Sequence, residues 1–126
     1  GTLIQPGSSH YNGKVVILVD ESSLSRAEFT AMALRAMPNA VVMGSTTAGA
    51  DGDVSAIPLP GGLNTMISGI GIFYPDHRAT QRVGIVPDVV VRPSVKGIAE
   101  GRDELVEAAE RLLEDSGERA NGHGEK

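Results

Sequence analysis

Ser25 and Glu28 stand three residues apart, where an apolar run of the sequence changes into a helical pattern. The run Val15–Val19 (VVILV) predicts a buried strand, and the residues from Ser25 onward predict a helix. A strand that breaks sharply and restarts as a helix exposes one side chain at the edge of a sheet. It also directs backbone N–H groups toward whatever reacts there. Ser25 is therefore a candidate nucleophile.

The same spacing has a simpler interpretation. Ser-x-x-Glu ahead of an apolar helical run is a capping box, which satisfies two N–H groups at the start of a helix. From the spacing alone this interpretation is favoured over a nucleophile. The two roles are compatible, because the start of a helix also offers N–H groups to an oxyanion.

A serine nucleophile needs a base that accepts its proton. The histidines are His10, His77 and His123, in a polar N-terminal segment, a predicted turn and a polar C-terminal segment, and the lysines are Lys14, Lys96 and Lys126. Each histidine fits a solvated surface position. No lysine falls in the glycine-rich stretch 44–53, so the sequence contains no obvious base.

The glycine-rich stretch 44–53 contains no clear metal-binding or nucleotide-binding motif. Asp51-Gly52-Asp53 resembles part of a calcium loop but lacks its 12-residue ligand spacing and terminal Glu, so turn chemistry explains it better. Its glycines form neither GxGxxG nor a phosphate-binding loop. We expect no metal and no cofactor.

The elements around these residues predict an α/β fold. Apolar residues at helical spacing indicate a helix over about 25–37, and Ala40–Met43 reads as a second buried strand. Strand, helix and strand within about 30 residues form a βαβ unit. The loop 44–53 would then line the crevice at the carboxyl end of the sheet.

The rest of the chain reads as a β-rich segment followed by a helix. We expect strands over 54–59, 63–67 and 69–74 that cap or extend the sheet, a turn at 75–78, and a short strand at 89–91. A helix is expected over 98–113. The predicted organisation is an arm or loop over 1–13, a domain over 14–114 and a polar, flexible tail over 115–126.

Composition narrows the classes of partner. The 126 residues suffice for one domain, and its core must be aliphatic because the chain has two Phe, two Tyr and no Trp. A net charge of −5 without a basic patch argues against nucleic acid. No apolar run is long enough to span a membrane, and there is no Cys to form disulfides.

Several motifs occur in a familiar order: VVILVDESSLSRAE, VVMGSTTAGADG, IPLPGGL, GIFYPDHRATQ and GIVPDVVVRP. With them, residues 14–95 resemble the C-terminal part of the protease domain of S41 peptidases, the carboxyl-terminal processing proteases and their tricorn-like relatives. The resemblance implies β/α layers related to the crotonase and caseinolytic-protease folds. It also implies an incomplete domain.

The resemblance implies roles for particular residues. Ser25 matches the nucleophilic serine of the family, and the Arg26 N–H would be one oxyanion donor. The loop residues that would line the substrate cleft are Thr47, Gly49, Ala50 and Asp51. Gln81 falls near the position of the polar or acidic partner in the tricorn-like branch, where it could orient an imidazole.

The chain also departs from the family pattern. Ala50 stands where the processing proteases carry a general-base lysine, and the histidine of the tricorn-like branch belongs to an upstream segment that this chain lacks. The expected function is a serine endopeptidase whose base comes from that segment, with little activity in the isolated chain. The alternatives are a non-catalytic peptide-binding or scaffold domain and, from a related fold, an acyl-CoA enzyme.

The resemblance further implies a protein or peptide substrate. We expect the chain to form a homo-oligomer or to pair with an upstream part of its own domain, because half of a domain would expose apolar sheet surface. Related proteases are often exported to the cell envelope, but nothing in this sequence assigns a location.

Overall fold

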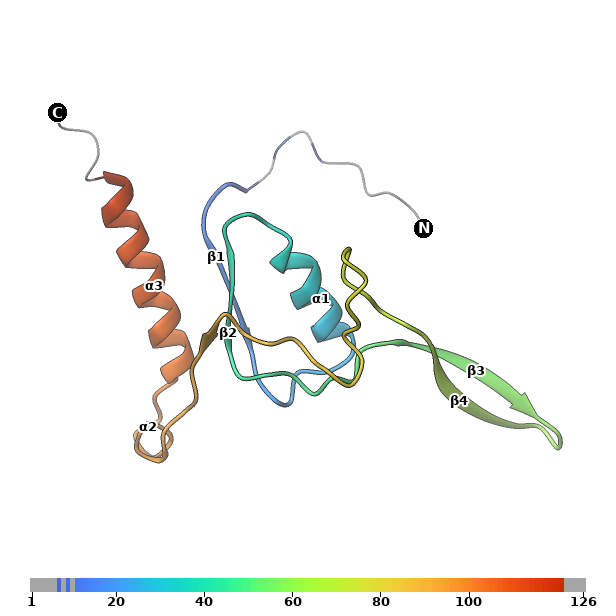
Figure 1. Cartoon of the computed structure of the whole chain (residues 1–126). Helices are drawn as coiled ribbons and strands as arrows, with labels where there is room; N and C mark the ends of the chain where they lie inside the picture. Colours follow the sequence, from blue (N-terminus) through green and yellow to red (C-terminus); the bar gives the residue numbers. More distant parts are fainter. Residues whose placement is uncertain (1–6, 8, 10, 122–126) are drawn as a thin grey trace.

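The computed structural model describes residues 7, 9 and 11–121, with side-chain surroundings to residue 115. A parallel sheet of three strands has the order β1-β2-β5, formed by Val15–Val19, Ala40–Gly44 and Val89–Val90. Helix α1, Arg26–Arg35, connects β1 to β2, so the predicted βαβ unit is present. β2 is the central strand, whereas β1 lies at an edge of this sheet (Figure 1).

The core lies between this sheet and α1. Ile17, Val19 and Val42 point to the same side of the sheet and pack with Ala31 of α1 and with Ile85, which is fully buried. On the opposite face Met43 is buried, and the long helix α3, Glu104–Asn121, lies against β1 and β2. Two helical layers therefore enclose a small aliphatic core, as the near-absence of aromatic residues requires.

The GIVPD segment leads into β5 and joins it to α1 and β2. The Asp88 carboxylate accepts the Val42 N–H over 2.9 Å, and Asp88 N–H donates to the Val42 carbonyl over 2.8 Å. Arg35, in the last turn of α1, forms an ion pair with the same carboxylate and donates to the Val86 carbonyl. These contacts fix the end of α1 relative to the sheet.

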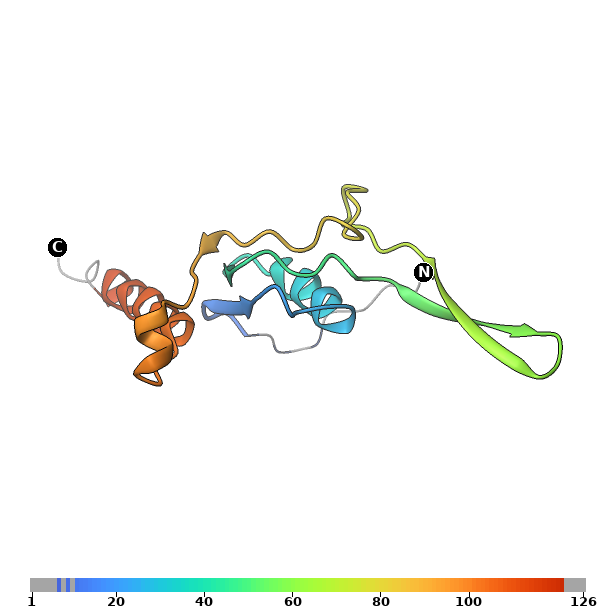
Figure 2. The same ribbon diagram turned by 90° about the horizontal axis from the view of Figure 1, so that it is seen from below.

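β3 (Asp53–Leu59) and β4 (Leu63–Ile70) form a separate antiparallel hairpin in which every residue is exposed. The hairpin extends away from the rest of the molecule, on the side opposite α3 (Figures 1 and 2). The expectation that these strands cap or extend the parallel sheet is therefore wrong. They pair only with each other, and their apolar side chains have no layer to pack against.

Residues 71–74 do not form the expected third strand of this region, and Gly69 and Ile70 belong to β4. Only an isolated bridge joins Phe73 to Ala79, around a turn in which Tyr74 N–H donates to the Arg78 carbonyl over 2.9 Å. The predicted turn at 75–78 is confirmed. Gly69 falls at the irregularity in the β3–β4 pairing, and Gly71, just past the end of β4, supplies no side chain to continue the ladder.

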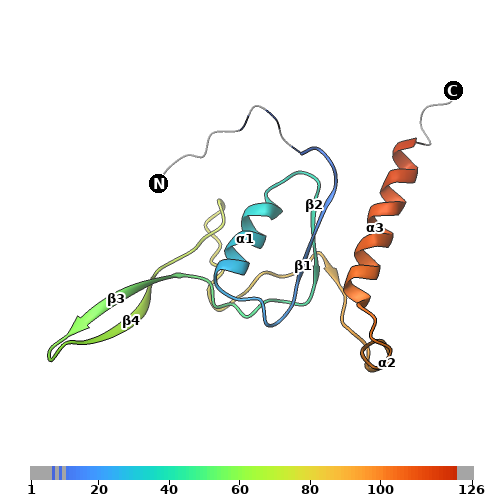
Figure 3. The same ribbon diagram turned by 180° about the vertical axis from the view of Figure 1, so that it is seen from behind.

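The expected helix over 98–113 is two helices, α2 (Val95–Ala99) and α3. The break falls at Gly101, whose φ of +68° ends α2, and Asp103 then caps α3 by accepting the N–H groups of Leu105 and Val106. α3 continues to Asn121 and includes much of the segment 115–126 that was expected to be a flexible tail (Figure 3). Residues 122–126, and most of the expected arm 1–13, lie outside the described residues.

Within the described residues, no helix combines the length and the apolar character needed to cross a membrane.

Candidate active site

Ser25 occupies a strained turn between β1 and α1. Its backbone has φ 53° and ψ −117°, a combination that L-residues rarely adopt and that differs from the extended backbone of an ordinary N-cap. Strain of this kind costs on the order of 1–3 kcal/mol and persists only where the surroundings enforce it. A serine on a strained strand-to-helix turn is typical of an exposed nucleophile.

The expected capping box is present, but its two halves differ. Ser25 N–H donates to Glu28 Oε2 over 3.1 Å, whereas the Ser25 side chain faces the Glu28 N–H without forming a full side-chain capping hydrogen bond. The hydroxyl is half-buried and lines a pocket of about 350 Å³. The cap is therefore provided mainly by Glu28, which leaves the Ser25 hydroxyl available for another role.

A turn just before Ser25 is built around Asp20. Asp20 Oδ1 accepts hydrogen bonds from the hydroxyl and the N–H of Ser22 and from those of Ser23, over 2.7–3.1 Å. The Ser22 hydroxyl, followed by the backbone and Ser23 contacts, lowers the pKa of Asp20 below its ordinary value of 3.8. The turn that follows β1 is thus held by hydrogen bonds among its own residues, Asp20, Ser22 and Ser23.

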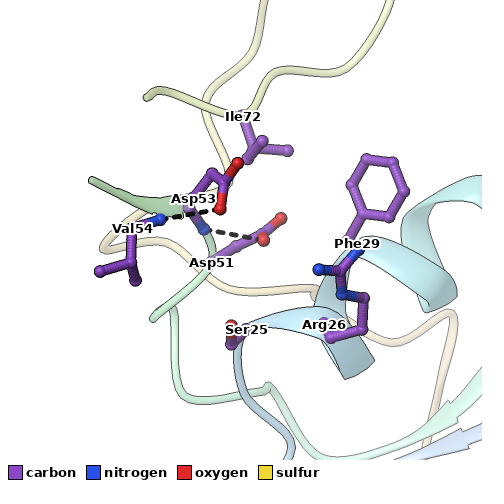
Figure 4. Close-up of a pocket in the computed structure, with 8 residues that line it drawn as sticks. Ser25, Arg26, Phe29, Asp51, Asp53, Val54 and Ile72 are labelled. Carbon is purple, nitrogen blue, oxygen red and sulfur yellow. Dashed lines mark hydrogen bonds between the residues drawn. The ribbon is translucent and has the colours of Figure 1, made fainter. Parts of the chain in front are cut away.

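The pocket beside Ser25 has an acidic side and an apolar side. Asp51 and Asp53 come from the loop after β2 and the start of β3, facing Ser25 and Arg26 at the start of α1 (Figure 4). Asp51 is buried, and its carboxylate accepts Gly52 N–H over 2.8 Å and the Thr80 hydroxyl over 3.2 Å. The apolar side consists of Phe29, Val54 and Ile72.

Arg26, whose N–H is the expected oxyanion donor, lies beside Ser25 at this pocket. It is the first residue of α1 and lines the same pocket as Ser25, and its N–H has no hydrogen-bond partner among the described residues. The N-terminus of a helix favours negative charge. This N–H can therefore stabilise an oxyanion that forms at Ser25.

The predicted cleft residues separate into two groups. Asp51 lines the pocket, whereas Thr47 is buried behind it, with its hydroxyl directed at the Glu28 carboxylate over 2.5 Å. Gly49 and Ala50 turn their N–H groups to that carboxylate as well, each over 2.8 Å. Three of the four residues thus donate to Glu28, and they are not among the residues that line this pocket.

Gln81 lies at the rim of the pocket rather than in its lining. A Cβ placed on Gly52, which lines the pocket, would stand 2.5 Å from Gln81 Nε2, so the amide rests directly on the loop that carries Asp51. Its side chain is half-buried. Gln81 is therefore close to the acidic side of the pocket.

No histidine or lysine lines this pocket in the part of the chain that the structure describes. His77 is exposed in the turn 75–78, and His10 and His123 lie outside the described residues. Within the described residues, no group of three or more His, Asp or Glu side chains could hold a metal ion. Among the described residues that line this pocket, none is a base for the predicted nucleophile.

The sequence spacing predicts that Glu28 caps a helix, but it does not predict how buried and how extensively hydrogen-bonded this side chain is. Its side chain is completely buried and accepts four hydrogen bonds, from Ser25, Thr47, Gly49 and Ala50. Three of those donors lie 19 to 22 residues further along the chain. The only local signal was its position three residues after Ser25, which a surface cap would share.

Several of the solved structures that are similar to this chain are peptidases. The chain is similar to a putative peptidase from Parabacteroides merdae, with 29% identity and a TM-score of 0.77 over 87% of this chain and 35% of the other. It is also similar in fold to mature CPAF in complex with lactacystin (21% identity, TM-score 0.69, 86% of this chain and 22% of CPAF). The tricorn protease matches with 18% identity and a TM-score of 0.69, over 82% of this chain and 10% of tricorn.

No curated protein matches the sequence. The chain spans about a third of the length of the Parabacteroides peptidase and smaller shares of CPAF and tricorn. The model of peptidase family S41 matches residues 3–91, which include both sheets and the Ser25 turn. The chain therefore belongs to peptidase family S41.

Proposed function

We propose that this chain carries the nucleophile of a serine endopeptidase and that Ser25 forms the acyl-enzyme. The observation that carries the proposal is the strained Ser25 turn, with its hydroxyl on a pocket and an unpartnered Arg26 N–H beside it. Membership of family S41 supports peptide-bond hydrolysis as the reaction class. The protein or peptide substrate follows from that class.

The chemistry would proceed in two halves. Ser25 Oγ attacks the carbonyl carbon while its proton passes to a base, and the carbonyl oxygen becomes an oxyanion held by the Arg26 N–H. As the intermediate collapses, the C–N bond breaks and the base returns the proton to the leaving amine. Water then hydrolyses the ester by the same steps and frees Ser25.

The base comes from residues outside those described, and a histidine from an upstream segment is the candidate. Gln81 would orient that imidazole by hydrogen bonding from the rim of the pocket, although an amide cannot stabilise imidazolium as a carboxylate would. Asp51 on the cleft loop would contact the substrate. Without the base the chain alone should turn over slowly or not at all, because general-base catalysis contributes about 10²–10⁴-fold.

The test is labelling of the full-length protein with a serine-directed fluorophosphonate. We expect labelling to disappear in Ser25→Ala and to persist in Ser68→Ala, an exposed serine on β4 that serves as the matched control. Equal labelling of Ser25→Ala and the parent would refute the proposal. Absence of labelling in a folded parent protein would favour the alternative, a peptide-binding domain that does not catalyse.

The 126-residue chain gives a second test of where the base lies. We expect no peptidase activity from it. Robust turnover that Ser25→Ala abolishes would show that a base is present within these residues, and His77 would be the first to replace.

The exposed hairpin supports a proposal about assembly. Leu63 is 66% exposed and Met66 is 73% exposed, and an isolated two-stranded hairpin is marginally stable in water. We therefore expect the hairpin to be covered in the working protein, by another copy or by an upstream part of the same domain.

A further inference from the structure

We propose that Glu28 and Thr47 are a positioning pair for the Ser25 site. In this proposal the ionised Glu28 carboxylate locks the nucleophile turn to the loop after β2. The inference rests on the proposed acyl-enzyme function of Ser25, and it assigns the two residues no direct contact with substrate.

The hydrogen bonds assign the charge on Glu28. Backbone N–H groups of Ser25, Gly49 and Ala50 can only donate. The Thr47 hydroxyl accepts the Ile85 N–H over 2.7 Å, so its own proton is free to point to Glu28 Oε1, 2.5 Å away. Both carboxylate oxygens therefore face donors alone, as the ionised form requires.

This charge is buried without a cation. Glu28 has no exposed surface, and none of the ion pairs among the described residues includes it. Burying an ionised carboxylate is costly unless its hydrogen bonds compensate. A glutamate at the surface would cap the helix without that cost, so capping alone does not account for this burial.

The carboxylate joins two segments that are distant in the sequence. Oε2 accepts from both Ser25 and Ala50, and Oε1 accepts from both Thr47 and Gly49. The strained backbone of Ser25 is thereby fixed to the loop that forms the acidic side of the pocket. Reaction rates are sensitive to such placement, because a shift of about 1 Å can cost about 10²-fold.

Thr47 connects these hydrogen bonds of Glu28 to the GIVPD segment. Besides the contact with Ile85 N–H, Thr47 N–H donates to the Ile85 carbonyl over 3.3 Å. Gly84 allows this approach, because a Cβ there would stand 2.6 Å from the Thr47 carbonyl oxygen. The GIVPD segment is thus connected to the Ser25 turn through the side chains of Thr47 and Glu28.

The experiment measures fluorophosphonate labelling of the full-length protein at several probe concentrations, which separates probe binding (KI) from the bond-forming rate (kinact). We expect Glu28→Gln to lower kinact by about 10–100-fold while KI changes by less than about twofold. The amide keeps the size of the side chain but turns an NH₂ group toward N–H donors. Thr47→Val should act similarly, and Thr47→Ser, which keeps the hydroxyl, should restore most of the rate.

Glu21→Gln is the matched control. The Glu21 carboxylate also accepts a short hydrogen bond from a serine hydroxyl, that of Ser45, but it lines a different pocket. We expect its kinact to equal that of the parent. The double variant Glu28→Gln/Thr47→Val should lose much less than the product of the two single losses, because the residues act as a unit.

Parent-like kinact in folded Glu28→Gln would overturn the inference, and so would equal rates in Thr47→Val and Thr47→Ser. If Glu28→Gln does not fold, the two Thr47 variants decide the question. The Ser25→Ala control separates this proposal from the acyl-enzyme function. Continued labelling of Ser25→Ala removes the function itself, whereas loss of labelling there with parent-like Glu28→Gln removes only the positioning pair.

Discussion

At the scale of single residues, Glu28 both accepts the N–H of Ser25 at the start of α1 and contacts the loop after β2. Ser-x-x-Glu correctly predicts that Glu28 meets the Ser25 N–H. It does not predict the burial of Glu28, because that depends on Thr47, Gly49 and Ala50, which approach only once β2 pairs with β1. Local capping is readable from spacing, whereas contacts between distant segments are not.

The Asp20 turn gives a prediction about pH. Because folding lowers the pKa of Asp20, its contribution to stability is complete above its unfolded pKa and is lost as the pH falls through the folded pKa. We expect its carboxyl NMR signal to titrate with a midpoint below 3.8. Asp20→Asn should reduce the loss of stability between about pH 4 and pH 2. A midpoint at or above that ordinary value would contradict the assignment.

Gly44 and Gly61 give a matched pair of glycine substitutions. Gly44 has φ +131°, and a Cβ there would stand 1.8 Å from the Val19 carbonyl oxygen, whereas Gly61 has φ +84° with open space around it. We expect Gly44→Ala to destabilise by more than about 3 kcal/mol, since strain and a backbone clash combine. Gly61→Ala should cost about 1–2 kcal/mol.

Urea unfolding followed by circular dichroism measures both changes. Similar midpoints for the two glycine variants would show that β1 and β2 tolerate a side chain at the end of their pairing.

At the scale of elements, the sequence predicts the parallel unit well and the hairpin poorly. Apolar runs and helical spacing locate β1, α1, β2 and β5 to within a few residues. For β1, α1 and β2 the reason is that they bury residues against one another, whereas β5 is exposed and only pairs with β2. The strands β3 and β4 show the same apolar residues but bury none of them. The expectation assumes that apolar side chains of a strand pack against a core, but among the described residues no layer covers these two strands.

The break between α2 and α3 has a signal in the sequence. Gly101 followed by Asp103 is a helix stop followed by a helix start, and both act in the structure as their types suggest. Helical spacing continues across the break, which favoured a single helix. A helix-stop glycine followed by a capping aspartate is therefore a stronger signal here than the helical spacing of apolar residues.

Charges on the hairpin give a prediction at this scale. Leu63→Lys/Met66→Lys replaces two of its most exposed apolar side chains, which lie on opposite faces of β4. If the hairpin mediates association, we expect the double variant of this chain to shift toward monomer in light scattering, with an unchanged urea midpoint. Thr65→Lys, an exposed polar position between them, is the control for added charge alone. A monomeric parent chain would contradict association of copies through the hairpin.

At the scale of the whole molecule, the site lies where three segments converge. The β1–α1 turn supplies Ser25 and Arg26, the loop after β2 supplies Asp51, and the base of the hairpin supplies Asp53 and Val54. The family and the nucleophile position were predicted from ordered motifs, and the family assignment is confirmed. The base could not be predicted from these residues, because no His or Lys of the described chain reaches the pocket.

The hairpin has a practical consequence for mapping this protein by digestion. No charged residue occurs from Val54 to Pro75, and no Lys or Arg lies between Arg35 and Arg78. Trypsin therefore cannot cut the most accessible part of the molecule, and a trypsin-resistant core would include the hairpin whether or not anything covers it. Chymotrypsin, which can cut after Leu63, Met66 or Phe73, would report directly on whether those residues are shielded in the full-length protein.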